Sequence, residues 1–346
     1  MSDDALVLGI ETSCDETAAA VVRADGMVLS SVVASQDEFH AHFGGVVPEI
    51  ASRRHAELIT AVVAEALSAA EVEPADLSLI AVVNGPGLIG SLVVGVAAAK
   101  AYSVAWSLPI VAVNHVEAHV TAAWLFRSPE ERRCPTYPAV ALVVSGGHTD
   151  LVLLRSDEDA QVLGSTRDDA AGEALDKAAR LLGLGYPGGP ALERAGKEGQ
   201  PTAFSLPAPH VPGYDFSFAG LKSALARLVE EMGEVSHSRI ADLAASFQEA
   251  IVRVLWEKAR AAALETCARQ LILAGGVAAN TRLRQVFCQI EADGIEFVAP
   301  AREFCTDNAA MVALCGATLY RRRGADDLTF DVFSALPWPG AKASTR

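Results

Sequence analysis

Two histidines, His115 and His119, are the residues of this sequence whose type and spacing most directly suggest chemistry. They follow an apolar run at residues 109–113 that predicts a strand. If the histidines open a helix, their spacing places both imidazoles on one face, one turn apart. Such a pair can share one metal ion and leave its other positions to a carboxylate, a ligand or water. The alternative is two helix histidines with ordinary hydrogen bonds.

Two acidic residues bear on what such a metal could do. Glu117 would lie about 200° around the helix from His115, so it cannot act as the base of an H-E-x-x-H protease, whose glutamate directly follows the first histidine. Asp307 precedes a helix predicted at about residues 309–320. It could cap that helix, or it could complete a His-His-Asp metal site.

A strand–turn–strand pattern occurs twice in the chain. Apolar runs at residues 6–10 and 18–22 flank one polar turn, and runs at 140–144 and 151–154 flank another. The hydroxyls of Thr12 and Ser13 could hold a phosphate or a metal-bound oxyanion, or they could cap their own turn. Two such units predict a duplicated α/β fold with one copy in each lobe. Facing hairpins of this kind grip nucleotide phosphates in the actin–hexokinase superfamily.

Glycine-rich stretches suggest further ligand positions. Gly275 and Gly276 follow a strand predicted at residues 271–274, and Asn280 lies near a helix start, an arrangement that can seat an adenine or ribose or be a plain turn. Residues 85–90 match G-x-G-x-x-G, but no acidic residue closes the next strand. We therefore interpret them as a tight strand-to-helix turn. Residues 186–190 predict a backbone-rich loop.

Charged residues outside these turns have two interpretations each. Asp168 and Asp169 are predicted to cap a helix at about residues 170–182. Glu173 and Asp176 on that helix are acceptors for ribose or substrate hydroxyls, or members of an exposed ion-pair stripe. A basic cluster at residues 53–55, before a helix predicted at 56–70, could touch a partner or an RNA, or be a solvated face.

Composition limits the function classes. A net charge of -15 argues against a protein that holds nucleic acid by bulk electrostatics, so a nucleic-acid substrate would need a local basic patch or a basic partner. Six cysteines without a C-x-x-C pair predict reduced, mostly buried thiols. The start is acidic, and residues 84–87 interrupt the uncharged run 77–99, which predicts a strand, a turn and a buried helix. We expect a soluble, cytoplasmic protein with no membrane partner.

Length and connectors predict the lobes. A chain of 346 residues is too long for one ordinary core. We expect an amino-terminal lobe at residues 1–130 and a carboxyl-terminal lobe at 137–306, separated by a polar connector. A helix at 307–330 would cross back to the first lobe, and residues 331–346 would form a tail.

Eight stretches, taken together and in order, closely resemble the tRNA threonylcarbamoyladenosine transferase family, once described as a glycoprotease family. They cover nearly the whole chain, and eight in order are far more specific than any one alone. They are residues 9–17, 44–49, 85–88, 115–119, 144–149, 168–173, 275–280 and 305–308.

The resemblance implies a two-lobed actin–hexokinase-like fold and one divalent metal, Fe²⁺ or Zn²⁺, held by His115, His119 and Asp307. It also implies a substrate pocket for threonylcarbamoyl-AMP, which an ATP- or ADP-type nucleotide could also occupy. At one pocket position many relatives carry an aspartate that contacts the ligand, where this chain has Glu193. The implied pocket residues are Val143, Val144, Ser145, Gly146, Gly147, Asp176, Gly189, Glu193 and Asn280.

The family's reaction, as the resemblance implies it, moves the threonylcarbamoyl group to the exocyclic amine of the adenosine beside the anticodon, in tRNAs reading codons that begin with A. Asp15, Glu16 and the leaving phosphate are candidates to accept the amine proton. In bacteria the family works with an inactive paralogue (TsaB), expected on the helix after Gly45, and a small ATPase (TsaE). A metalloprotease and a non-catalytic nucleotide-binding scaffold are the alternatives.

Overall fold

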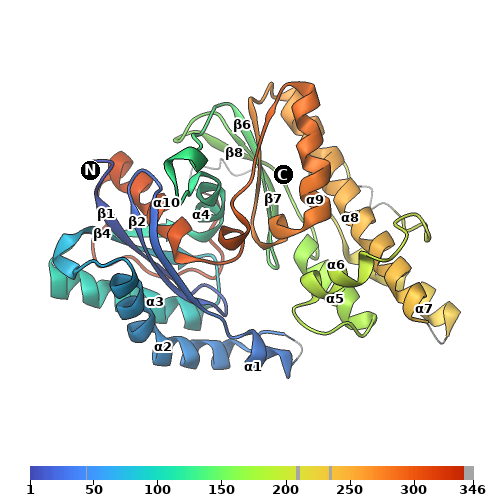
Figure 1. Cartoon of the computed structure of the whole chain (residues 1–346), viewed down its shortest axis with the longest axis horizontal. Helices are drawn as coiled ribbons and strands as arrows, with labels where there is room; N and C mark the ends of the chain where they lie inside the picture. The colour runs from blue at the N-terminus through green and yellow to red at the C-terminus, as the bar shows by residue number, and fades with distance from the viewer. Residues whose placement is uncertain (44, 208–210, 234–235, 339–346) are drawn as a thin grey trace. The chain divides into compact units, whose positions relative to one another are not determined.

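The computed structural model describes residues 1–43, 45–207, 211–233 and 236–338, and the chain forms two compact units (Figure 1). Within the described residues, unit 1 comprises Met1–Cys134 and residues 300–338, and unit 2 comprises Pro135–Ala299. Gly44, which belongs to one of the motifs, and residues 339–346 of the predicted tail lie outside the described residues. Each unit contains one five-stranded sheet.

The sheet of unit 1 has the strand order β3-β2-β1-β4-β5. β1 pairs antiparallel with β2 and parallel with β4, and β4 pairs parallel with β5. The first predicted hairpin is therefore confirmed as β1 and β2. The strands are β1 (Leu6–Glu11), β2 (Thr17–Arg23), β3 (Val28–Ala34), β4 (Leu77–Gly85) and β5 (Ile110–Asn114).

Helices cover both faces of this sheet (Figure 1). Successive strand residues point to opposite faces, so Val7 of β1 joins the core under α10 while Leu8 joins the core under α2 and α3. A Cβ placed on Gly9 would lie 2.0 Å from the Ala309 carbonyl oxygen, so glycine lets α10 approach β1 closely. The helices are α1 (Asp37–Ala41), α2 (Pro48–Ala69), α3 (Ile89–Trp106), α4 (His115–Thr121) and α10 (Ala309–Arg323).

The sheet of unit 2 has the order β10-β9-β6-β7-β8, and its antiparallel pair β6 and β7 is the second predicted hairpin. Its strands are β6 (Ala139–Val144), β7 (Thr149–Leu154), β8 (Ala160–Ser165), β9 (Gln270–Ala274) and β10 (Glu296–Val298). Its helices are α5 (Ala171–Leu181), α6 (Gly188–Gly196), α7 (Ala219–Met232), α8 (His237–Glu265) and α9 (Thr281–Phe287).

Helix α2 begins eight residues earlier than the sequence predicted. Pro48 occupies its first turn, where the missing N–H costs nothing, and Val47 before it is extended. His55 therefore lies inside the helix and is fully buried, with its ring bonded to Thr17 and to the Cys14 carbonyl. The predicted basic surface cluster at residues 53–55 is wrong, because one of its three members faces the core.

Two local predictions in unit 2 are also wrong. Asp168 and Asp169 do not cap α5, whose N-cap residue is Ala170. Asp168 instead accepts hydrogen bonds from the backbone N–H groups of Phe218 and Ala219, at the start of α7. The loop predicted at residues 186–190 is partly helical, because α6 already begins at Gly188.

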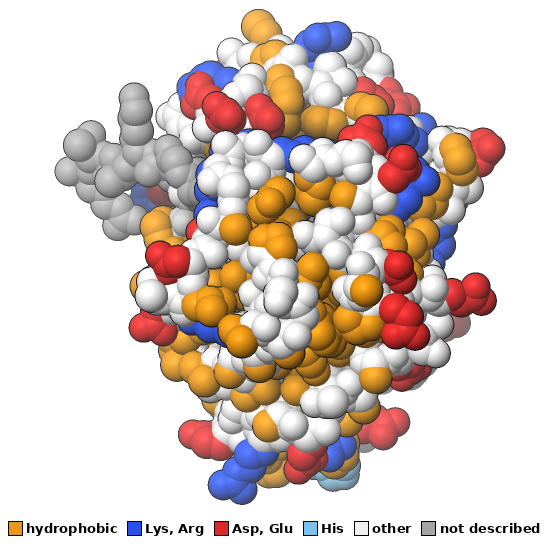
Figure 2. Space-filling view, turned by 90° about the vertical axis from the view of Figure 1, so that its left-hand side faces the viewer, with side chains coloured by type: hydrophobic (Ala, Val, Ile, Leu, Met, Phe, Trp, Pro, Cys, Tyr) orange, Lys and Arg blue, Asp and Glu red, His pale blue; other side chains and the backbone are white. Residues whose placement is uncertain are grey.

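The uncharged run at residues 77–99 forms β4, a turn and the first part of α3, as predicted. By length and composition α3 could cross a membrane, but it packs against β4 and α2, as the helices of soluble α/β proteins do. Its other face is more open than predicted and exposes Ile89, Val93 and Val104. Figure 2 shows one side of the molecule, with hydrophobic side chains exposed between charged ones.

The cysteines differ from the expectation of mostly buried thiols. Cys305 and Cys315 are buried and Cys14 is partly buried, but Cys134, Cys267 and Cys288 are exposed.

Candidate functional site

The two histidines are set by the junction of β5 and α4. Asn114 ends the strand, and its side-chain oxygen accepts hydrogen bonds from the N–H groups of Val116 and Glu117, at 2.9 and 3.2 Å. This cap starts the helix at His115. The rings of His115 and His119 then lie 4.6 Å apart between centroids, in an edge-to-face arrangement. The predicted one-face pair is therefore present.

Asp307 lies beside this pair. It does not cap α10, because the next residue, Asn308, does so. Asn308 caps α10 by accepting from the Met311 N–H at 3.0 Å. The Asp307 oxygen Oδ1 lies 3.2 Å from Nε2 of His119 and 3.6 Å from Nε2 of His115. One possible ligand atom from each of the three residues lies within 4.8 Å of the others.

Behind His115 lies a carboxylate that sequence reasoning missed. Oε2 of Glu11 is 3.1 Å from Nδ1 of His115, and the Oγ of Ser13 is 3.2 Å from the same nitrogen. An ionised carboxylate only accepts, so Nδ1 carries the proton toward Glu11 and Nε2 faces Asp307. A carboxylate behind a metal-binding imidazole fixes its tautomer and raises its basicity. A charged residue at the end of the buried strand β1 was the signal available in the sequence.

The chemistry of these donors fits a divalent cation. His119 is fully buried, and apart from the 3.2 Å contact of Nε2 with Asp307 neither of its ring nitrogens makes a hydrogen bond within the described part of the chain. Burial alone would lower the pKa of His115, but the negative charges of Asp307 and Glu11 outweigh it and raise that pKa to about 9. A cation between the three side chains would take Nε2 of each imidazole as a ligand and balance the negative charges of the carboxylates.

The turn between β1 and β2 is tied to α2 and α3. Thr12 donates its hydroxyl to the Ser91 carbonyl at 2.9 Å, so this predicted phosphate donor is engaged inside unit 1. The Cys14 carbonyl accepts from Nε2 of His55 and from the Ser91 hydroxyl. These contacts fix the backbone of the next two residues, which carry the candidate catalytic carboxylates.

Asp15 and Glu16 form an acidic group with Asp37, with carboxylate oxygens within 4.8 Å of one another. Burial, followed by the negative charges of Asp307 and Asp15, raises the pKa of Glu16 well above its usual range. Glu16 therefore lies within electrostatic reach of the histidine–aspartate set.

In unit 2 the turn between β6 and β7 has one packed and one open side. Ser145 and His148 close the turn by two hydrogen bonds, and Gly172 packs so tightly that a Cβ there would lie 2.4 Å from the Ser145 carbonyl oxygen. A Cβ at Gly146 or Gly147 would meet open space. Both glycines are exposed on that side.

Strand pairing places other predicted pocket residues beside this turn. Val143 pairs with Ala274. A Cβ on Gly275 would lie 2.5 Å from the Val144 carbonyl oxygen, so glycine is required there. Gly276 follows in a short helical turn, Gly276–Ala279, that leads to Asn280.

The remaining predicted pocket residues are linked in pairs. Asp176 accepts from the Gly189 N–H at 2.9 Å. Glu193 accepts from the Thr281 N–H at 3.1 Å, so the longer side chain reaches the start of α9. Asn280 caps α9 through the Leu283 N–H and donates to Gln248.

Glu173 lies apart from these pairs. It forms an ion pair with Lys177 at 2.9 Å and is half exposed. The alternative interpretation of this residue as part of an ion-pair stripe fits that contact.

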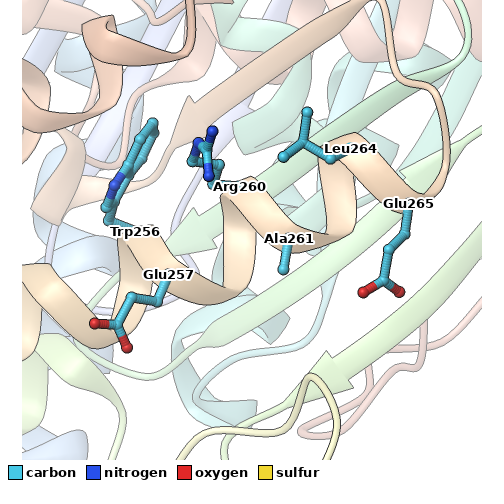
Figure 3. A pocket seen from close by; sticks show the side chains of 6 residues that line it. All are labelled: Trp256, Glu257, Arg260, Ala261, Leu264 and Glu265. Carbon is cyan, nitrogen blue, oxygen red and sulfur yellow. The ribbon is translucent and has the colours of Figure 1, made fainter. Parts of the chain in front are cut away.

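A surface pocket on α8 contains none of the predicted residues. Figure 3 shows the residues that line it, which all come from α8. The pocket has a volume of about 400 Å³. Within that lining Glu265 is engaged by the Tyr214 hydroxyl, and Arg260 forms a bidentate pair with Asp293. The pocket therefore offers no converging catalytic groups.

Comparison with solved structures shows the fold. A HypF structure from T. kodakarensis superposes with a TM-score of 0.62 at 16% identity, covering 93% of this chain and 48% of that one. Component A of the Acidaminococcus fermentans (R)-2-hydroxyglutaryl-CoA dehydratase gives 0.51 at 15% identity, covering 92% and 99%. With two sheets built around paired hairpins, the chain has the predicted actin–hexokinase-like α/β fold.

Sequence comparison then identifies the family. Residues 27–314 match the family model described as TsaD, tRNA N6-adenosine threonylcarbamoyltransferase. Enzymes of that name from Thermomicrobium roseum and Symbiobacterium thermophilum are each 49% identical, over 96% of this chain and 96% and 97% of their own lengths. A third, from Anaeromyxobacter dehalogenans, is 51% identical over 94% and 98%. The chain belongs to this family and is an acyltransferase.

Proposed function

We propose that this chain transfers the threonylcarbamoyl group from threonylcarbamoyl-AMP to the exocyclic amine of the adenosine beside the anticodon, in tRNAs that read codons beginning with A. Family membership supports the transferase class and the tRNA acceptor. The observation that carries the proposal is the convergence of His115, His119 and Asp307, with Glu11 behind His115. Glu11 ends β1 and His115 follows β5, so the set lies at the carboxyl ends of strands, where ligands of α/β sheets bind.

The two imidazoles and Asp307 would hold one divalent ion, Fe²⁺ or Zn²⁺, and leave positions open for a ligand. Such an ion, when bound, supplies a Lewis acid and an anchor for oxygen atoms of the threonylcarbamoyl end. The chain's own part is positional. Helix α4 fixes both rings, and Glu11 holds the His115 tautomer that leaves Nε2 available.

The transfer itself needs one proton acceptor. The amine nitrogen forms a bond to the carbamoyl carbon, the bond from that carbon to the phosphate oxygen breaks, and AMP leaves as the nitrogen gives up a proton. Glu16, whose pKa is raised by burial and by the neighbouring negative charges, is one candidate to take it. Asp15 and the leaving phosphate are the other candidates.

Unit 2 carries groups that suit an adenylate. The open amides at Gly146 and Gly147 suit phosphate oxygens, and Asn280, Asp176 and Glu193 offer polar groups to the nucleoside. An ATP- or ADP-type nucleotide would use the same groups. The carboxylate of Glu193 accepts from the Thr281 N–H and so lies at the start of α9. An aspartate at position 193 would have a side chain one methylene shorter.

The proposal includes partner proteins. A net charge of -15 makes tRNA binding by this chain alone unfavourable, so we propose that it assembles with an inactive paralogue and a small ATPase, in the cytoplasm. The exposed apolar side chains of α3, beside α2, support a paralogue contact on these helices.

The test is the nucleoside content of tRNA in cells depleted of this protein. Wild-type protein should restore threonylcarbamoyladenosine by mass spectrometry, and His119→Ala should not. The purified variant should also lose bound metal while keeping its circular dichroism spectrum.

The matched control is His237→Ala, because His237 is an exposed histidine at the start of α8. A His119→Ala protein that kept both metal and full modification activity would contradict the site assignment. Peptide hydrolysis that disappeared with the metal, with tRNA nucleosides unchanged, would favour a protease instead.

A further inference from the structure

The chain after α10 is not used by the proposed function, yet it is bound closely to unit 1. Residues 326–337, here called the strap, contact β5, α3, β4, the turn after β4 and the residue before His115. Phe330 and Val332 of the strap pack against the cores of unit 1. The strap is therefore part of the unit 1 architecture.

The first half of the strap lies along β5 and α3. Asp326 donates its N–H to the Ile110 carbonyl at 2.9 Å and accepts from the Ala112 N–H at 2.8 Å. Lys100 of α3 donates to the Phe330 carbonyl at 2.6 Å, with its ammonium 4.3 Å from the centre of the Phe330 ring.

The second half crosses the end of β4. Asn84 donates its side-chain amide to the Asp331 carbonyl at 3.0 Å and accepts from the Phe333 N–H at 2.8 Å. A Cβ on Gly85 would lie 2.5 Å from the Phe333 carbonyl oxygen, so this glycine is what lets the strap lie flat on the strand end.

The strap ends at the cap of the histidine helix. The amide nitrogen of Asn114 donates to the carbonyls of Leu336 and Pro337, at 3.4 and 3.2 Å. The oxygen of the same amide is the cap of α4. One side chain therefore joins the strap to the first turn of the helix that carries His115 and His119.

A second connection reaches His115 through the turn after β4. Gly87 donates its N–H to the Ser334 carbonyl at 3.3 Å, and Leu88 donates to the Ser13 carbonyl at 2.8 Å. Ser13 in turn places its hydroxyl 3.2 Å from Nδ1 of His115. Strap contacts thus reach the histidine pair from two sides.

We propose that the strap is a positioning element for the metal-binding helix α4, and that Asn114 is the positioning residue through which it acts. The proposal rests on the metal site of the proposed function. With the strap in place, the Asn114 side-chain amide has one orientation, in which its nitrogen donates to the strap carbonyls and its oxygen accepts from the first N–H groups of α4. Without it, the cap can rotate, and the two imidazoles lose the fixed geometry that tight metal binding requires.

Two full-length variants release the strap in different ways. Asn114→Ser keeps an oxygen that can cap α4 but has no amide to donate to Leu336 and Pro337. Gly85→Ala leaves the Asn114 side chain unchanged, although Gly85 pairs with Asn114 between β4 and β5, and pushes on the Phe333 carbonyl with its new methyl group. Gly220→Ala in α7 is the matched control, because a Cβ there meets open space.

The readouts are Co²⁺ affinity with its visible absorption spectrum, and hydrogen exchange of residues 326–337. Both strap variants should exchange faster in this segment, bind Co²⁺ about tenfold or more weakly, and show an altered spectrum. Gly220→Ala should match the wild type in all three. Two independent variants keep the test valid if one of them does not fold.

Faster exchange of the strap with unchanged Co²⁺ affinity and spectrum would overturn the proposal and leave the proposed function standing. A second outcome would also overturn the proposal: Asn114→Ser binds Co²⁺ more weakly, while Gly85→Ala loosens the strap and keeps the wild-type Co²⁺ affinity. Asn114 would then act only as the cap of α4. A wild-type protein that bound no Co²⁺, Fe²⁺ or Zn²⁺ would overturn the metal site on which both rest.

Discussion

At the scale of single residues, the site depends on side chains that act through His115. Glu11 is fully buried and accepts from the Ser13 N–H as well as facing the imidazole. A buried carboxylate needs such partners, because leaving its charge unpaired would be costly. The same pairing orients the imidazole, so the needs of folding and of metal binding agree at this position.

Replacing Glu11 with glutamine tests this orientation. The amide oxygen can still accept from Nδ1, but without the negative charge the imidazole becomes a weaker ligand. We expect Glu11→Gln to weaken Zn²⁺ binding by about tenfold, measured by competition with a chelating dye. Glu57→Gln, at an exposed position of α2, is the control. Equal Zn²⁺ affinity in Glu11→Gln and the wild type would show that Glu11 serves folding alone.

At the scale of elements, carboxylates cap helices other than the ones they precede. Asp168 follows β8 but binds the first N–H groups of α7, and Lys177 of α5 reaches back to Asp169. Burial would raise the pKa of Asp168, but hydrogen bonds from Ser217, Phe218 and Ala219 outweigh it and lower that pKa. The ionised form of Asp168 therefore fastens the connector after β8 to the start of α7.

The pH dependence of this contact has a defined sign. A carboxylate whose pKa is lowered by folding stabilises the fold above its unfolded pKa of about 3.9 and loses that effect as the pH falls through the folded value. We expect Asp168→Ala to lower the free energy of unfolding by about 1 kcal/mol at neutral pH. The difference from the wild type should shrink in urea titrations below pH ~4.

The exposed Asp157→Ala in the turn after β7 is the control for charge removal alone. A loss of stability in Asp168→Ala that was the same at acidic and neutral pH would rule out the ionised cap.

At the scale of the whole molecule, charge and function conflict. The chain carries -15, while the acceptor that we propose is a polyanion. Coulombic repulsion weakens such a complex most at low salt, the opposite of ordinary protein–nucleic acid binding. A basic partner would remove the conflict by supplying the phosphate contacts.

We therefore expect the isolated chain to bind tRNA more weakly than about 1 µM at physiological salt. Addition of the paralogue and the ATPase should tighten binding and give it the usual loss of affinity with rising salt. Fluorescence anisotropy with labelled tRNA measures both. Tight binding by the isolated chain that weakens as salt rises would instead indicate a basic tRNA surface on this protein.

The sequence by itself determined the features that depend on near neighbours. A spacing of four residues placed His115 and His119 on one helix face, because the helical repeat fixes that relation locally. Short apolar runs on either side of a polar turn predicted the two hairpins, because a strand and its turn are also local features. The eight motifs identified the family and, with it, the class of fold.

Only the tertiary structure decided which distant groups meet. Glu11 lies behind His115, His55 is buried against the turn after β1, Asp168 caps α7, and the strap holds Asn114. Each of these contacts joins segments far apart in the chain, and in all of them except the Glu11–His115 pair one partner is a backbone carbonyl or N–H group. No local pattern can select among them, because it is the packing of the sheets and helices that brings one particular pair within reach.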